Sequence, residues 1–298
     1  MSGVSPLHIE QLTTEAGGFR LGPVNLRLEP GLIYALVGPN GSGKSMLLKC
    51  CMNLIKTYTG HVSLFGLSSG REEPSVCERV AFSPDPLEGC EPFTLLQMES
   101  FIAPWYAAWD HRDFLRRAEQ FRLPLKKRYG LLSQGERKKI ALTLALSTRA
   151  PLLLLDEPTD GLDIASRSRF KQMLVEDADT LERTILLTTH SVEDIRKLAD
   201  YIVLLKNGQI EGPYEKDALT ESWRRFWLSG EALPDIAGIP GVVEYSQSAF
   251  PQLVTRDGAA TMAYLTGHGI EITKDQPLSL DELLERLLHE QTPMEWKG

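Results

Sequence analysis

The sequence predicts an α/β fold built around a mostly parallel β-sheet, and three observations support this prediction. Short, strongly apolar runs recur along the chain, at Ile33–Val37, Leu152–Leu155 and Thr184–Thr188. Each run is followed, after a loop, by a segment with helical character. Strands that alternate with helices form parallel sheets, and such strands are apolar throughout because helices cover both faces.

The other elements of this region are expected in chain order around those strands. Further strands are expected at Leu7–Leu12, Val24–Leu28, His61–Leu64, Arg79–Phe82, Tyr201–Leu205 and Gln209–Glu211, the last two joined by the hairpin signal Asn207-Gly208. Helices are expected at Met46–Asn53, Leu95–Ala108, Arg112–Phe121, Gly135–Thr148 and Ile164–Leu174, with a further helix after Ser191. Residues 86–132 therefore form a largely helical subdomain.

A change of pattern at Ser229-Gly230 predicts two domains, residues 1–229 and residues 230–298. A helix at Lys216–Trp227 is expected to end the first domain. The second is expected to be a small α+β unit, with strands at Gly241–Tyr245, Gln252–Val254 and Ile270–Thr273 and helices at Thr261–Thr266 and Leu280–His289. Leucines at 280, 283, 284, 287 and 288 form a stripe on the last helix, which packs either on its own sheet or on another copy of the chain.

Composition limits the classes of function that the chain can have. Its 298 residues are 42% hydrophobic and 24% charged, as in globular proteins with a sizeable core. The net charge of −8 argues against a nucleic-acid partner. The sequence contains no apolar run long enough to span a membrane and no signal-peptide pattern at its start. The four cysteines, Cys50, Cys51, Cys77 and Cys90, lack metal-ligand spacing and are expected to be reduced thiols of a cytosolic protein.

A glycine-rich loop follows the strand Ile33–Val37 and precedes a helix. Its sequence, GPNGSGKS from Gly38 to Ser45, fits the phosphate-binding pattern G-x-x-x-x-G-K-[ST]. Successive backbone N–H groups and the start of the helix can face phosphates there. Lys44 supplies a charge for the β- and γ-phosphates and Ser45 a hydroxyl for Mg²⁺. The nucleotide-binding residues expected here are Gly38, Pro39, Asn40, Gly41, Ser42, Gly43, Lys44, Ser45 and Met46.

Two carboxylates end the strand Leu152–Leu155 in the sequence LLLLDEP. Adjacent carboxylates at the end of a buried strand are costly unless a cation is near, and a magnesium nucleotide at the glycine-rich loop supplies one. Asp156 fits a metal contact, and Glu157 fits the base that polarises the attacking water. His190 follows another buried strand and is expected to sense the γ-phosphate. Lys44, Glu157 and His190 are the predicted catalytic residues.

The ordered set of motifs resembles the ATP-binding subunit of a bacterial ABC transporter. GPNGSGKS resembles the Walker A motif of that family, LLLLDEP its Walker B motif, and Asp160–Asp163 its D-loop. His190 stands at the place of the switch histidine. The sequence LSQGE resembles the signature LSGGQ and contributes Ser133, Gln134, Gly135 and Glu136. The resemblance covers about residues 1–215, and it implies a P-loop ATPase core of the ABC type.

The resemblance also implies ligands and partners. Ser45, Asp85 and Asp156 would contact Mg²⁺, with Asp85 in place of the family's Q-loop glutamine. Ser133 to Glu136 and Asp163 would reach the ATP bound to a second protomer, either a copy of this chain or a related subunit. Phe19 is the candidate for stacking on adenine. The chain would sit in the cytoplasm on the inner face of the membrane and drive a separate transmembrane permease, with an insert and a C-terminal unit resembling those of exporters.

Two other functions compete with ATP-driven transport. A soluble ABC ATPase acting on translation or DNA usually has two such domains or a long coiled coil, and neither pattern occurs in this acidic chain. A regulatory nucleotide-binding module without turnover would not need Glu157 and His190. Arg137, Lys138 and Lys139 are expected on an exposed helix face.

Overall fold

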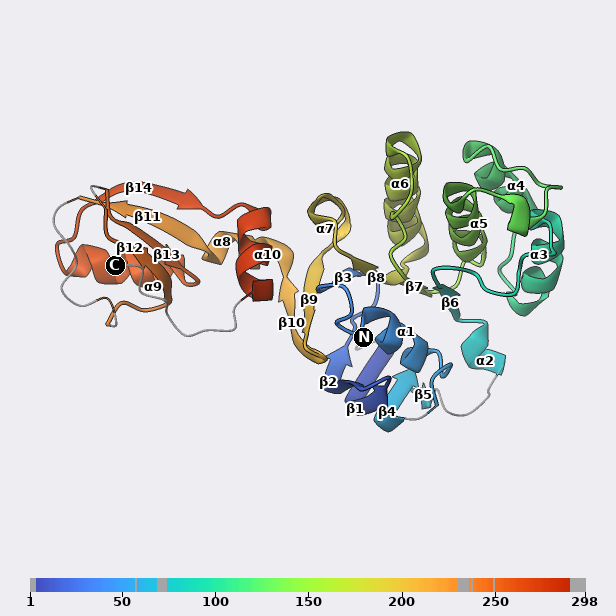
Figure 1. Cartoon of the computed structure of the whole chain (residues 1–298), viewed down its shortest axis with the longest axis horizontal. Helices are drawn as coiled ribbons and strands as arrows, with labels where there is room; N and C mark the ends of the chain where they lie inside the picture. The colour runs from blue at the N-terminus through green and yellow to red at the C-terminus, as the bar shows by residue number, and fades with distance from the viewer. Residues whose placement is uncertain are drawn as a thin grey trace. The chain divides into compact units, whose positions relative to one another are not determined.

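The structure is a computed structural model that describes residues 4–56, 58–68, 74–229, 236, 238–248 and 250–289. The chain divides into two compact units, Met1–Pro213 and Tyr214–Gly298. Figure 1 labels their elements in chain order.

The first unit is organised around a six-stranded sheet with the strand order β10-β9-β3-β8-β7-β6. Parallel pairing joins β9, β3, β8, β7 and β6, as the sequence predicted. Asn207 and Gly208 have φ angles of 49° and 76° and form the turn between β9 and β10. The strands are β3 (Ile33–Val37), β6 (Val80–Ser83), β7 (Leu152–Leu155), β8 (Thr184–Thr189), β9 (Tyr201–Lys206) and β10 (Gln209–Glu215).

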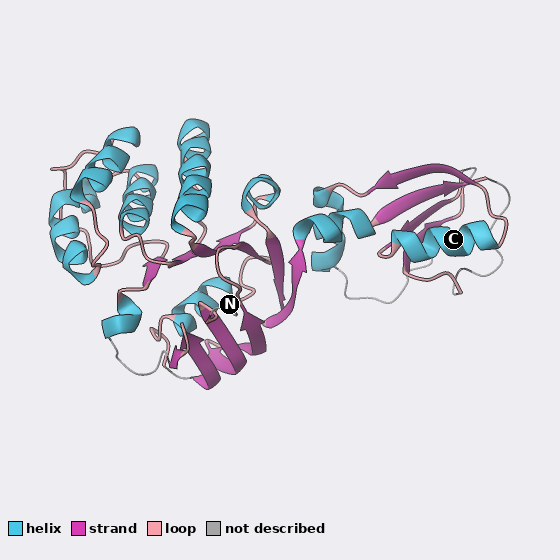
Figure 2. Ribbon diagram, turned by 180° about the vertical axis from the view of Figure 1, so that it is seen from behind, coloured by secondary structure: helices cyan, strands magenta, loops and turns pink. Residues whose placement is uncertain are grey.

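A second sheet of four strands, in the order β2-β1-β4-β5, completes the first unit (Figure 2). Its strands pair antiparallel and are β1 (Leu7–Ala16), β2 (Phe19–Arg27), β4 (Tyr58–Leu64) and β5 (Leu67–Ser68). The helix α1 (Lys44–Cys51) contributes Leu47, Leu48, Cys50 and Cys51 to a core that includes both sheets. Burial raises the pKa of Cys50 to about 11, so this thiol stays protonated at neutral pH. This packing fixes the start of α1 at the end of β3.

Helices occupy the predicted subdomain and flank it. They are α2 (Pro74–Cys77), α3 (Leu95–Ile102), α4 (His111–Gln120), α5 (Gln134–Ser147), α6 (Ile164–Leu181) and α7 (Val192–Leu198), with 3₁₀ turns η1 (Ala103–Trp105) and η2 (Tyr129–Leu131). Asp163 and Ser191 cap α6 and α7, as predicted. The helix expected to continue to Ala108 ends at Ile102, because Pro104 cannot donate a backbone hydrogen bond.

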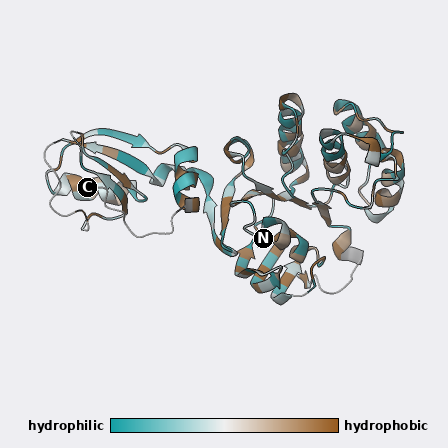
Figure 3. Cartoon of the chain, in the orientation of Figure 1, coloured by the Kyte–Doolittle hydropathy of each residue, from teal (hydrophilic) through white to brown (hydrophobic). Residues whose placement is uncertain are grey.

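The second unit contains an antiparallel sheet in the order β12-β13-β11-β14. The order and directions are those of a ferredoxin-like sheet. Its elements are α8 (Lys216–Ser222), β11 (Arg224–Leu228), β12 (Val242–Ser246), β13 (Gln252–Thr255), α9 (Gly258–Gly267), β14 (Ile272–Pro277) and α10 (Leu280–His289). Five of the six residues of β14 are exposed, and Figure 3 colours this strand mostly as hydrophilic.

Two expectations for this region were wrong. The helix predicted at Lys216–Trp227 ends at Ser222, and β11 follows it. Phe226 and Leu228 are buried while Trp227 between them is only partly covered, which is the alternation of a strand. Because β11 lies between β13 and β14, the boundary falls after Pro213 and not near Ser229.

The leucine stripe of α10 is buried within a single chain. Leu280, Leu283, Leu284 and Leu287 are each less than 9% exposed. Ion pairs also join this helix to strands of its own unit, from Glu282 to Arg225 of β11 and from Arg286 to Glu244 of β12. The stripe therefore needs no second copy to cover it, which favours the first of the two alternatives.

Candidate functional site

The glycine-rich loop lies between β3 and α1, where the sequence placed it. Gly43 has a φ of 104°, which L side chains rarely adopt, and a Cβ at Gly38 would lie 2.2 Å from the carbonyl oxygen of Leu205. Lys44 is the first residue of α1, and its Nζ donates to the carbonyls of Gly38 at 2.8 Å and Pro39 at 3.3 Å. The ammonium group is therefore folded over the loop that is expected to receive phosphates.

Phe19, the first residue of β2, lies against this loop. A Cβ at Gly43 would lie 3.0 Å from Cε1 of the Phe19 ring. The sequence spacing left the position of this aromatic ring open, and the structure places it beside the glycine that precedes Lys44.

A hydroxyl on β8 organises the two carboxylates that follow β7. The Oγ1 of Thr188 donates to Oδ1 of Asp156 at 2.8 Å and accepts the backbone N–H of Glu157 at 2.8 Å. Glu157 has a φ of 43°, a strained value for a residue other than glycine. Thr188 thus holds the backbone of Glu157 in a conformation that the residue would otherwise rarely adopt.

The three residues predicted to be catalytic meet around the Glu157 carboxylate. Its Oε1 lies 3.6 Å from Nζ of Lys44, and its Oε2 lies 3.1 Å from Nδ1 of His190. The side chains of Lys44 and Glu157 are 7% and 20% exposed, whereas that of His190 is 60% exposed. The carboxylate therefore lies between a buried cation and a ring that faces solvent.

The motif LSQGE forms the start of α5. Ser133 is the N-cap residue, and its side chain accepts the N–H of Glu136 in a reciprocal capping box. A Cβ at Gly135 would lie 3.2 Å from the carbonyl oxygen of Gly161, so this helix start closely approaches the segment that leads to α6. There Asp163 caps α6, and its Oδ2 forms an ion pair with Nζ of Lys139 at 2.8 Å.

Comparisons with known proteins identify the family of the chain. A family model described as "ABC transporter" matches residues 21–160. The ABC transporter ATP-binding protein YtrB of Bacillus subtilis is 25% identical over 282 residues, which cover 93% of this chain and 96% of that protein. The hemin import ATP-binding protein HmuV of Shewanella denitrificans is 30% identical over 217 residues, 67% of this chain and 85% of that protein.

The chain belongs to the ABC transporter ATP-binding protein family. A solved structure of an ATP-binding subunit of an ABC transporter superposes with a TM-score of 0.66 at 24% identity, covering 73% of this chain and 92% of that one. This neighbour confirms the predicted P-loop fold of the ABC type. The protein is an ATPase coupled to transport. Within the part of the chain that the structure describes, no helix is long and apolar enough to cross a membrane.

The predicted metal contacts have different surroundings. Asp156 is 5% exposed at the end of β7, while Ser45 is exposed on the first turn of α1. Asp85, at the place of the Q-loop glutamine, forms an ion pair with Lys138 of α5, at 2.8 Å between Oδ2 and Nζ. No group of three or more histidine, cysteine or acidic side chains suited to a metal ion occurs among the described residues. A magnesium ion here would therefore depend on phosphate oxygens and water for most of its ligands.

Two polar residues of the site were missed or misplaced by the sequence reasoning. Lys138 was expected on an exposed helix face, but it is 4% exposed and faces the end of β7, so that prediction was wrong. Thr188 was interpreted only as part of a buried strand. A threonine inside an otherwise apolar strand was the available signal, because a buried hydroxyl needs a hydrogen-bond partner.

Proposed function

We propose that this ABC ATPase dimerises on ATP and drives export through a separate transmembrane subunit, using Glu157 to polarise the attacking water. The observation that carries the proposal is the convergence of Lys44 and His190 on the two oxygens of the Glu157 carboxylate. A carboxylate held between these groups can accept a proton from water beside the γ-phosphate. His190, whose side chain is exposed, is then available to contact that phosphate.

The remaining roles follow from the position of each group. The N–H groups of the loop and the start of α1 bind the phosphates, and Lys44 neutralises part of their charge. Ser45 and Asp156 would hold Mg²⁺ together with phosphate oxygens, and the bound ion lowers the charge of the β- and γ-phosphates. The ring of Phe19 provides an apolar face for the adenine.

The helix start at Ser133 supports the proposal of a head-to-tail dimer. Ser133 and Gln134 are exposed and Glu136 is partly exposed at the beginning of a 14-residue helix, whose N–H groups can receive an anion. In the family this end of the helix faces the ATP of a second protomer. Such an arrangement would place two composite sites between two chains.

The proposed direction of transport and the proposed location on the inner face of the membrane are supported by resemblance to other ABC subunits. The segment PFTLLQMESFIAPWYAAWD and the C-terminal unit resemble those of exporters, which favours export through a partner that carries the membrane spans. The ATPase unit is also similar to a protein named for hemin import. The direction of transport can be measured in vesicles that contain the co-purified complex. The measurement is whether ATP makes these vesicles lose substrate or accumulate it.

A substitution of Glu157 tests the catalytic proposal. Glu157→Gln keeps the size of the side chain and removes the base, so turnover should fall about a hundredfold or more while ATP binding is retained. The variant should accumulate as an ATP-bound dimer, because the dimer no longer dissociates after hydrolysis. Sedimentation measures this dimer. Steady-state ATP hydrolysis near that of the wild type would exclude Glu157 from this role.

Mixed protomers test the dimer. Lys44→Ala and Ser133→Arg each disable both composite sites of a homodimer, but a heterodimer of the two retains one complete site. Mixing the variants under conditions of subunit exchange should restore ATP binding that neither shows alone in its dimer. An absence of recovery, with exchange verified by a fluorescent label, would contradict the head-to-tail arrangement.

A further inference from the structure

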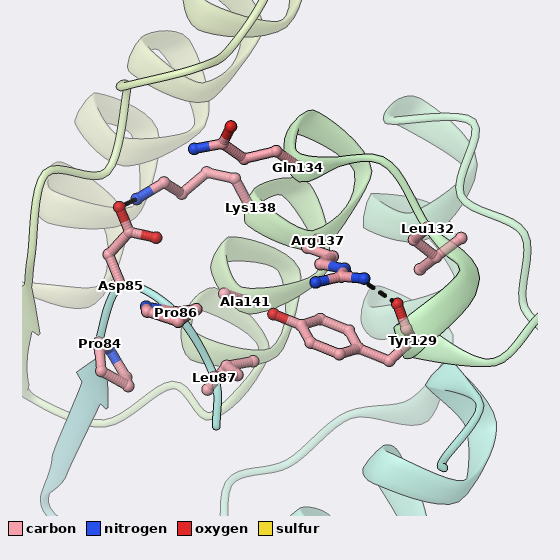
Figure 4. Close-up of a pocket in the computed structure, with 10 residues that line it drawn as sticks. All are labelled: Pro84, Asp85, Pro86, Leu87, Tyr129, Leu132, Gln134, Arg137, Lys138 and Ala141. Atoms are coloured by element: carbon pink, nitrogen blue, oxygen red, sulfur yellow. Dashed lines mark hydrogen bonds and ion pairs between the residues drawn. The ribbon is translucent and has the colours of Figure 1, made fainter. Parts of the chain in front are cut away.

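An ion pair with a buried cation connects the end of β6 with α5, the helix that begins at the signature. Lys138 of α5 has a side chain that is 3% exposed, and its Nζ lies 2.8 Å from Oδ2 of Asp85. The same ammonium group donates to the backbone carbonyl of Asp156 at 3.4 Å. One cation therefore contacts both the Asp85 carboxylate, as Figure 4 shows, and the Walker B segment.

The neighbouring cation on the helix has a different environment. Arg137 donates to the carbonyls of Tyr129 at 3.1 Å and Gly130 at 2.6 Å, away from the acidic residues. A cavity of about 480 Å³ lies beside the pair and is lined by Asp85, Lys138 and Arg137 among others (Figure 4). Of Arg137 and Lys138, only Lys138 forms an ion pair with Asp85.

The burial of Lys138 makes the loss of its partner costly, although the Asp85 side chain is itself 33% exposed. An ammonium group that is almost fully buried is costly unless it is paired and hydrogen-bonded, and Asp85 provides its counter-charge. Conversely, Asp85 adds a negative charge near Asp156 and Glu157, where a polyphosphate is expected to bind. Without Lys138 that charge would repel the nucleotide.

We propose that Lys138 is a positioning residue that holds Asp85 on α5, and that this ion pair, and not a metal contact, is the function of Asp85. The inference rests on the proposed nucleotide site. The pair neutralises the acidic side chain at the Q-loop position and ties α5 to the Walker B strand through the Asp156 carbonyl. Asp85 then acts on ATP only through Lys138.

A double-mutant cycle of Asp85→Asn and Lys138→Met tests the pair on the full-length protein. Lys138→Met leaves an uncompensated carboxylate, so affinity for the non-hydrolysable analogue Mg·AMP-PNP in calorimetry should fall about tenfold, the effect of one unit charge at about 10 Å. The double variant should recover to within about threefold of the wild type, because both charges are gone. Lys138→Arg keeps the cation beside a cavity that can accept it, and should bind like the wild type.

Thermal unfolding without nucleotide provides a second readout that does not depend on nucleotide binding or turnover. Asp85→Asn leaves the Lys138 ammonium buried without a counter-ion and should lower the unfolding midpoint by about 5 °C, and part of this loss should return in the double variant. Lys126→Met, at an exposed lysine of the helical subdomain, is the matched control and should change neither measurement. A failure of ATP turnover in the wild type would count against the proposed function but would leave this unfolding cycle interpretable.

The magnesium requirement distinguishes the pair from a metal ligand. In the positioning role, Asp85→Asn should change the Mg²⁺ concentration needed for half-maximal AMP-PNP binding by less than about twofold. A tenfold increase in that concentration for Asp85→Asn, without a similar increase for Lys138→Met, would overturn the proposal and make Asp85 a metal ligand. Additive losses in the double variant would overturn it as well, because independent residues show no coupling.

Discussion

The Ser133 hydroxyl is engaged by a carboxylate of its own motif. It donates to Oε2 of Glu136 at 2.9 Å, and the Ser133 backbone N–H donates to the same oxygen at 2.8 Å. These hydrogen bonds, the backbone one first, lower the pKa of the Glu136 carboxyl. A phosphate that approached Ser133 would therefore compete with a carboxylate for the same donors.

Glu136→Gln should make ATP-driven dimerisation easier. Glutamine keeps the capping box but removes the negative charge, so the ATP concentration for half-maximal dimer formation should fall by about threefold to tenfold. Sedimentation of Glu136→Gln and wild type, each in a Glu157→Gln background, measures the difference. An unchanged ATP requirement would mean that the carboxylate does not compete with phosphate.

Glu136→Gln should also change how the stability of the protein depends on pH. Because the pKa of Glu136 is lower in the folded protein than in the unfolded chain, its carboxylate stabilises the fold above the unfolded pKa of about 4.3. That contribution is lost as the pH falls through the lowered folded value. The acid limb of thermal stability should therefore be shallower in Glu136→Gln than in the wild type.

At the scale of elements, a buried charge network joins the helical subdomain to the core. Asp177 of α6 accepts from Arg117 of α4 at 2.8 Å and from Arg183 at 2.7 Å. Arg183 is fully buried, and burial lowers its pKa to about 10, so it remains charged at neutral pH. It also donates to the carbonyl of Leu146 at the end of α5. One carboxylate thus links three helices through two arginines.

Asp177→Ala should destabilise the protein strongly. Removal of the shared carboxylate leaves two buried guanidinium groups short of a partner, at a cost of about 3–5 kcal/mol in the free energy of unfolding. Asp179→Ala, at an exposed position of the same helix, matches the change in helix propensity and should cost less than about 0.5 kcal/mol. Urea denaturation of both variants gives the comparison, and equal losses would show that the network contributes nothing.

At the scale of the whole molecule, the nucleotide site and the C-terminal unit are separate structures. Lys44, Asp156, Glu157 and His190 all lie in the first unit. Division after Ser229 would leave β11 without its partners β13 and β14, whereas division at the end of β10 preserves both sheets of the first unit. We propose that the second unit is an accessory or dimerisation domain and does not contribute to the ATPase centre.

A chain that ends at Glu215 should therefore bind ATP like the full-length protein. Its affinity for Mg·ATP should change by less than about threefold, while dimer affinity or regulation that depends on the second unit should fall. Calorimetry and sedimentation on the truncated protein, with circular dichroism to verify folding, make the measurement. Loss of ATP binding by a folded truncated chain would place part of the nucleotide site in the second unit.

The sequence by itself determined the α/β class, the order of the strands in the chain, and the position of the phosphate loop. These features are local: the loop needs glycine and lysine at fixed spacing after a strand, and apolar runs identify strands that are covered on both faces. For the same reason the sequence predicts Asp163 and Ser191 as helix caps, and their side chains accept backbone N–H groups at the starts of α6 and α7. The convergence of Lys44, Glu157 and His190 could be expected because all three follow parallel strands at the same edge of the sheet.

Only the tertiary structure decided which polar side chains meet across elements. Lys138 looked like an exposed helix residue, and its burial against Asp85 depends on how α5 packs beside β6 and β7. Thr188 reaches Asp156 because β7 and β8 are neighbours in the sheet, which strand patterns do not specify. The segment at Arg224–Leu228 became a central strand because β13 and β14, distant in sequence, supply its hydrogen-bond partners. Such contacts depend on residues far apart in the chain, and local periodicity carries no information about them.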